Sequence, residues 1–202
     1  MYWVYQTRIY YWRSQYVQAR LIEPPPRDLK KLYSDDGFRD PMQDEPYGVN
    51  LALTYKINPK HPHPDNYFQS AGFTLFSGRL VELMQSFGVK SEVFPVTMVD
   101  QERNIQSDLK YYVFHSLEGV LEAMDEEQSE WTGDRDIGIP HLVLDESKFE
   151  RRPIFLSNHI YIPLMRDDLK QEIQHQGITG FSFLAPERYR SGSYGFAPDF
   201  DD

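Results

Sequence analysis

The hydrophobic pattern of this chain changes period between two nearby segments, and this change most constrains the fold. Over residues 51–57 large apolar side chains alternate with smaller or polar ones, which is typical of a strand with one buried face. Between Ser77 and Gly88 apolar side chains recur every three or four positions, which predicts an amphipathic helix that Ser77 caps and Gly88 ends. A chain with both patterns is expected to fold as an α+β protein.

Other segments extend this pattern. Asp167 and Asp168 favour the positive end of a helix dipole and Gly177 favours a helix end, so residues 167–177 predict a second helix. Ser116 is expected to cap a third helix, whose apolar face contains Leu117, Val120, Leu121 and Met124. Strands are predicted over residues 2–11, 92–98, 110–115, 139–144, 153–156, 159–162 and 181–184. We therefore expect a largely antiparallel sheet with about three short helices against one face.

Composition divides the chain into three ranges. Residues 1–72 are predicted to form a β-rich N-terminal section with loops, whose packing the sequence leaves uncertain because prolines at 24–26 and within 59–64 interrupt regular structure. Residues 73–184 are predicted to form an α+β domain. Residues 185–202 combine glycine, serine, proline and acidic residues, which predicts a flexible tail. No internal repeat is apparent in the sequence.

The charge balance restricts the partners of this chain. The formal net charge of −10, from 31 acidic and 21 basic residues, disfavours binding to nucleic acid or to an anionic membrane. Partners are expected to be basic or neutral, although an acidic surface also serves solubility alone. The absence of cysteine excludes disulfides and thiolate metal sites. The sequence has neither the pattern of a secretory signal nor a long apolar run, so we expect a cytoplasmic protein without membrane contact.

Five short segments occur in an order and spacing that resemble one bacterial protein family. They are Phe73–Ser77, Tyr111–His115, Leu121–Glu130, Pro153–Leu156 and Gly177–Phe181. With these segments the chain resembles the immunity protein 11 family of bacterial polymorphic, contact-dependent and type VI secretion toxin systems. The resemblance implies a non-enzymatic protein that binds a cognate toxin encoded by a neighbouring gene and blocks it by occlusion. The aromatic N-terminus and the acidic tail depart from the family pattern, so the resemblance implies neither the identity of the toxin nor the contact surface.

The acidic segment from Asp125 to Asp136 has the features that binding to a protein partner requires. Charged rims accelerate association, whereas buried aromatic or arginine anchors supply affinity. The segment would act as a decoy for the basic, nucleic-acid-binding groove of a toxin, with Trp131 as its anchor. In the alternative interpretation it is a solvated loop in which Trp131 packs on the core and Asp125 caps a turn. The candidate partner-binding residues are Asp125, Glu126, Glu127, Glu130, Trp131, Asp134 and Asp136.

Other candidates for chemistry lack a complete site. His61 and His63 lie two residues apart, but no third ligand has a suitable spacing, so we expect neither a metal nor another cofactor. The string at 192–195 lacks the strand–turn–helix context of a catalytic serine and no phosphate-binding loop is present, so we expect no enzyme. Tyrosines near the N-terminus alternate with arginines at 8, 13 and 20, which indicates a nucleic-acid stacking platform or a buried sheet face. The net charge favours the sheet face.

Functions of different classes fit these observations. The first is a toxin-neutralising immunity protein. The alternative is a general protein-interaction or assembly module, in which aromatic N-terminal surface forms a homo-oligomer and no toxin is involved. A toxin-like neighbouring gene would distinguish the two. A small-ligand enzyme would instead require a deep pocket lined by convergent polar groups.

Overall fold

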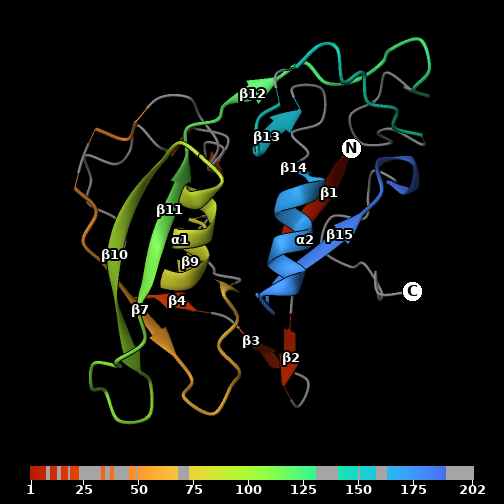
Figure 1. Ribbon diagram of the computed structural model, residues 1–202. Coiled ribbons are helices and arrows are strands. Elements are labelled where there is room, and N and C mark those ends of the chain that lie inside the picture. The colour runs from red at the N-terminus through yellow and green to blue at the C-terminus, as the bar shows by residue number, and fades with distance from the viewer. Residues whose placement is uncertain are drawn as a thin grey trace.

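The structure, a computed structural model, has an α+β fold in which two β-sheets each carry a helix (Figure 1). The residues that the structure describes are 1–7, 10–12, 15–17, 19–22, 33–34, 37–38, 46–48, 50–67, 73–130, 141–149, 151–157 and 163–189. In these ranges no helix is both long and apolar enough to cross a membrane.

The larger sheet has six strands in the order β4, β7, β10, β11, β9 and β8. All neighbouring pairs are antiparallel except β7 and β10, which are parallel. The α-helix on this sheet is α1 (Gly78–Ser86), and Ser77 caps it by accepting a hydrogen bond from the Leu80 amide. The strand bounds are Arg20–Leu21 for β4, Leu53–Ile57 for β7, Asn66–Tyr67 for β8, Leu75–Ser77 for β9, Ser91–Asp100 for β10 and Tyr111–Ser116 for β11.

The smaller sheet has five strands in the order β12, β13, β14, β1 and β15. Only β12 and β13 are parallel neighbours. Its helix is α2 (Asp167–His175), and a 3₁₀ helix, η2 (Pro186–Arg188), follows the last strand. The strand bounds are Tyr2–Thr7 for β1, Val120–Leu121 for β12, Ile154–Ser157 for β13, Pro163–Arg166 for β14 and Phe181–Leu184 for β15. Two small hairpins pair β2 (Tyr10–Trp12) with β3 (Gln15–Val17) and β5 (Tyr33–Ser34) with β6 (Gly37–Phe38).

Both sheets contain the same strand–helix–strand unit. In the larger sheet β9 and β10 run parallel, joined by α1, and β11 lies between them antiparallel to both. In the smaller sheet β14 and β15 run parallel, joined by α2, and β1 lies between them in the same way. Each half of the molecule is therefore a split β-α-β unit.

The two units also match residue by residue, with no insertion between them. Leu75 corresponds to Leu164 and Leu80 to Leu169, and all four side chains are fully buried. Gly88 (φ 78°) corresponds to Gly177 (φ 61°), and each glycine ends its helix in the left-handed conformation. The correspondence is partial, because the buried Val81 and Leu83 of α1 correspond to Lys170 and Glu172, which are only partly buried in α2. Few residues are identical between the units, so the structural repeat is not apparent in the sequence.

Three clusters of buried side chains form the core. The inner cluster joins both helices with the facing sides of both sheets, for example Leu80 and Met84 of α1 with Leu169 and Ile173 of α2. A second cluster covers the other face of the larger sheet around Tyr55. An outer cluster covers the other face of the smaller sheet, where residues from 123–149 pack on β1 and β13. Both helices therefore lie on the inner side, and the two sheets share one core.

A buried carboxylate joins the two halves at the edge of the larger sheet. Asp65, which is 4% exposed, accepts hydrogen bonds from Arg79 Nε and Nη2 and from Ser77 Oγ, each at 2.6 Å. Its Oδ2 atom, which also accepts from Arg79 Nη2, accepts from the Thr179 amide (2.9 Å) and hydroxyl (3.1 Å), in the turn between α2 and β15. At Gly180 (φ 95°) a Cβ atom would lie 2.2 Å from the carbonyl oxygen of Asn66, so only glycine allows this approach.

Most of the element predictions are confirmed, with one clear error. The α+β class is confirmed, and so are the helices predicted at 77–88 and 167–177. The helix predicted from Ser116 is wrong: Gly119 has a φ of 75°, and Val120–Leu121 forms a strand with β13 instead. The described residues thus contain two α-helices rather than three, and two main sheets rather than one. The strand predicted at 159–162 lies outside the described residues.

The predicted three-range division stays a prediction, but strands from 1–72 and from 73–184 share both sheets. The strand β1 lies inside the smaller sheet, and β4, β7 and β8 belong to the larger one. Within the predicted tail, η2 is ordered and Tyr189 is 2% exposed in the outer cluster. The core therefore extends to Tyr189.

The Asp65 site makes a testable prediction about acid stability. Burial raises the pKa of Asp65, but the hydrogen bonds from Arg79, Ser77 and Thr179 outweigh this and hold the pKa below its usual value. The folded state therefore favours the charged carboxylate, and this stabilisation is lost as the pH falls below about 4 through the folded-state pKa. Asp65→Asn should lower the free energy of unfolding at pH 7 by about 2 kcal/mol.

Urea titrations of both proteins between pH 7 and pH 2 measure this effect. The difference between the native protein and Asp65→Asn should be constant from pH 7 to about 5 and should narrow below about 4. A difference that is independent of pH would mean that the charge of Asp65 does not stabilise the joint.

Candidate functional site

The acidic segment forms an irregular hairpin beyond the smaller sheet, which we call the acidic arm and define as residues 122–130 and 141–148. Its two sides are joined by backbone hydrogen bonds from Asp125 to Val143 (2.9 Å), from Asp145 to Ala123 (3.0 Å) and from Glu130 to His141 (3.0 Å). In Figure 1 this part of the chain follows β12 and extends away from both helices. Of the strand predicted at 139–144, residues 139 and 140 lie outside the described residues, and residues 141–144 form two isolated bridges, at His141 and Leu144.

The base of the acidic arm is fixed to the core. Ala123, Met124 and Leu142 are buried in the outer cluster, together with Phe149 at the end of the arm. The hydroxyl of Ser129 donates to the carbonyl of Val143 (3.1 Å) and accepts from its amide (2.9 Å), which closes the hairpin farther out. Because apolar burial and paired backbone groups hold both sides, the charges of the arm are carried on an ordered scaffold.

Asp125 has a structural role in this arm. Its Oδ1 atom accepts hydrogen bonds from the backbone amides of Glu127 and Gln128, both at 3.0 Å, and Oδ2 accepts from the side chain of Gln128. Such turns are typical of aspartate, whose short side chain reaches amides two and three residues on. The interpretation that Asp125 caps a turn is therefore confirmed.

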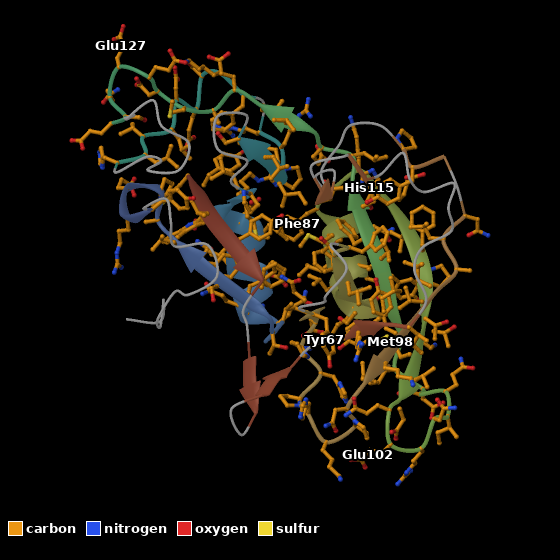
Figure 2. All side chains as sticks on the ribbon, turned by 180° about the vertical axis from the view of Figure 1, so that it is seen from behind. Tyr67, Phe87, Met98, Glu102, His115 and Glu127 are labelled. Atoms are coloured by element: carbon orange, nitrogen blue, oxygen red, sulfur yellow. The ribbon has the colours of Figure 1, made fainter. Side chains whose placement is uncertain are left out.

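Three of the candidate binding residues lie on the surface of the arm. Glu126, Glu127 and Glu130 are exposed, and Figure 2 shows Glu127 at the outer end of the molecule, far from Glu102. The turn at Asp125 and the bridge from Glu130 to His141 bring these carboxylates together on one hairpin. The candidates Trp131, Asp134 and Asp136 lie outside the described residues.

The structure adds two glutamates that the sequence analysis did not select. Glu122 pairs with Lys148 at 3.2 Å, and Glu146 lies 3.1 Å from the Met1 nitrogen. The hydrogen bond that the Lys148 ammonium donates to Glu122 raises the pKa of Lys148, and the ammonium also donates to the carbonyl of Met124 at 3.0 Å. Lys148 is thus the cation of the arm, among more numerous carboxylates. Sequence spacing gave no signal for these residues, because the pairing of 122–125 with 143–145 brings them together.

The histidines that the structure describes do not converge on one point, and His159 lies outside the described residues. Among the residues that the structure describes, no group of three histidine, aspartate or glutamate side chains could hold a metal ion. His61 instead contacts the Asn58 amide at 3.2 Å, and His63 contacts the hydroxyl of Tyr67 at 3.4 Å. Burial lowers the pKa of His63, and the neighbouring His61 lowers it further. His115 is fully buried, and its ring stacks on Tyr47 at 3.8 Å between ring centres.

The other N-terminal and C-terminal candidates are only partly described. Arg20 is exposed at the start of the edge strand β4. On β1, Tyr5 is 8% exposed in the inner cluster, which agrees with a buried sheet face. The arginines at 8 and 13 and the string at 192–195 lie outside the described residues.

Comparison with known protein families gives a match. The sequence model of an immunity protein family, Imm11, matches residues 9–187. This confirms the resemblance that the five short segments indicated. No curated protein matches the chain.

The arm allows its structural and surface carboxylates to be distinguished by mutation. Asp125→Ala leaves the amides of Glu127 and Gln128 without their acceptor and should lower the free energy of unfolding by about 1 kcal/mol. Glu127→Ala, at an exposed neighbouring position, should change it by less than about 0.5 kcal/mol. Urea denaturation of the two variants measures the difference. Equal effects would show that the turn does not depend on Asp125.

Proposed function

Because this chain belongs to the Imm11 immunity protein family, we propose that it neutralises a cognate toxin by binding it stoichiometrically and occluding its active surface. The family match over residues 9–187 is the observation that carries the proposal. It supports a role in toxin immunity, which requires binding rather than catalysis. The occlusion mechanism and the contact surface are our further proposals.

The acidic arm is the surface that we assign to toxin binding. Glu126, Glu127 and Glu130 present negative charge on a hairpin held to the core, and the whole chain carries a net charge of −10. Exposed charges of one sign attract an oppositely charged partner before contact and raise the association rate. A fixed hairpin also loses little conformational entropy when it binds. The arm therefore fits a partner with a basic face.

A basic face is common where a protein binds nucleic acid, so a toxin that acts on nucleic acid would suit the arm. In this proposal the carboxylates take the place of phosphates in the groove of the toxin. Asp125 then acts indirectly, because its turn positions Glu127 while its own oxygens bond to backbone amides.

The proposal also includes the cellular location of the protein and the genetic origin of its toxin. We propose that it acts in the cytoplasm of the producing cell, and that the toxin is encoded by a neighbouring gene of a polymorphic or type VI secretion system. A protein that meets the toxin before the toxin reaches its target would prevent self-intoxication.

Co-purification and survival test the proposed function directly. The protein is co-expressed with the product of the adjacent gene, and cell growth is compared with and without it. We expect a stable one-to-one complex and restored growth. A growth defect that persists, with no complex, would contradict the immunity role and favour an assembly module.

The charges of the arm predict a specific kinetic effect. The triple variant Glu126→Lys, Glu127→Lys, Glu130→Lys should slow association with the toxin at least about tenfold at low salt and weaken its salt dependence. A matched control carries the same change of charge elsewhere, at the exposed residues Glu82, Glu102 and Asp108. Stopped-flow association at several salt concentrations should show the larger effect in the arm variant. Equal slowing in both would indicate net charge and not the arm.

A further inference from the structure

A lysine on α2 lies over two aromatic rings of the smaller sheet. The ammonium of Lys170 lies 3.0 Å from the ring centre of Trp3, on β1, and 5.8 Å from that of Phe183, on β15. Both rings and the lysine are partly buried. A cation above the face of a tryptophan is attracted to the ring quadrupole, which fixes the position of the long side chain.

The carboxylate of Asp167, whose charge acts on Lys170, is already occupied. Its Oδ1 accepts a hydrogen bond from the indole nitrogen of Trp3 (2.7 Å), and its Oδ2 accepts from the side-chain amide of Gln171 (2.7 Å). Within the described residues no carboxylate forms an ion pair with Lys170. Burial lowers the pKa of Lys170, and the charge of Asp167 opposes this change. The ammonium is therefore held partly out of water, and none of the described carboxylates bonds to it.

This lysine is linked to the acidic arm through Met1. The backbone of Asp167 donates to the carbonyl of Met1 (3.1 Å), and the Met1 nitrogen lies 3.1 Å from Glu146 of the arm. Met1 itself is 63% exposed, and Trp3 lies two residues later on β1. The base of the arm packs on the outer face of the smaller sheet and α2 packs on its inner face, so a partner that covers the Met1 end of β1 could contact both.

We propose that Lys170, supported by Trp3, is the cationic anchor of the toxin interface and pairs with a carboxylate on the toxin. The inference rests on the proposed function and defines the partner further. The toxin face would carry a basic region opposite the acidic arm and an acidic side chain opposite α2. A face with both signs of charge fixes the orientation of the complex, which an acidic arm alone would not do.

The position of Lys170 assigns it a different kinetic role from the arm. An exposed lysine loses its water shell when it binds, and this opposes pairing. Lys170 is already partly desolvated and its side chain is fixed on the ring of Trp3, so less hydration and less conformational freedom are lost. Close charge pairs in an interface mainly determine the dissociation rate, whereas rim charges mainly determine the association rate.

The test compares three lysine variants in complex with the product of the neighbouring gene. Lys170→Met keeps a long side chain over Trp3 but removes the charge, and should raise the dissociation rate at least about tenfold with little change in association. Lys170→Arg keeps the charge and the ring contact and should stay within about threefold of the native rate. Lys110→Met removes an exposed charge from the connection between β10 and β11 of the larger sheet and should change neither the association rate nor the dissociation rate. Surface plasmon resonance measures both rates.

Thermal melting of each variant alone shows that it is folded before binding is compared. Native dissociation kinetics for Lys170→Met would overturn the anchor and leave the proposed function intact. The same would follow if Lys110→Met dissociated as fast as Lys170→Met, because the effect would then be one of net charge. If the native protein formed no complex, the proposed function and the anchor would both be wrong.

Discussion

The arrangement of the two halves depends on the buried carboxylate of Asp65. A buried charge is tolerated only where hydrogen bonds replace its water, and the bonds to Asp65 come from the start of α1 and from the turn before β15. The charge therefore requires both units to be present in one relative position. Gly180 completes the contact, because a larger residue would keep Asn66 and this turn apart. One polar site thus specifies how two apolar surfaces meet.

The repeated unit separates what the fold requires from what function requires. Several buried positions agree between the units, as Leu80 and Leu169 show. The exposed sides differ: Ser77 caps α1, whereas α2 begins after Arg166 with two acidic residues in its first turn. Similar apolar packing therefore occurs in both units, whereas the charged and aromatic residues on their surfaces differ. The acidic arm and Lys170 both lie on the half built on the smaller sheet.

The sequence predicts the helices and strands whose bounds depend on neighbouring residues. The prediction fails where pairing between strands far apart in the sequence determines the structure. Ser77 and Gly88 bound α1 as expected, because caps act within one turn. The same reasoning fails at Ser116, since pairing of Val120 with Leu156 in β13 outweighs a short apolar periodicity. The repeat and both sheet orders arise from strands far apart in sequence. Glu126, Glu127 and Glu130 could be selected as a charge run, but the neighbours of Lys170 come from β1, α2 and β15 and could not.

The acidic residues of this structure form two groups, those that accept hydrogen bonds from backbone amides and those that are exposed on the surface. Composition alone does not distinguish the two groups. Asp65, Asp100 and Asp125 each accept hydrogen bonds from backbone amides, so part of the acidic excess holds turns together. Glu126, Glu127 and Glu130 of the arm are exposed, whereas Glu122 and Glu146 form ion pairs with Lys148 and the Met1 nitrogen. Aspartate is suited to the first role because its reach is short. The arm therefore uses one acidic residue type to build the hairpin and the other to give it charge, which explains how a highly charged segment can remain ordered and still attract a partner.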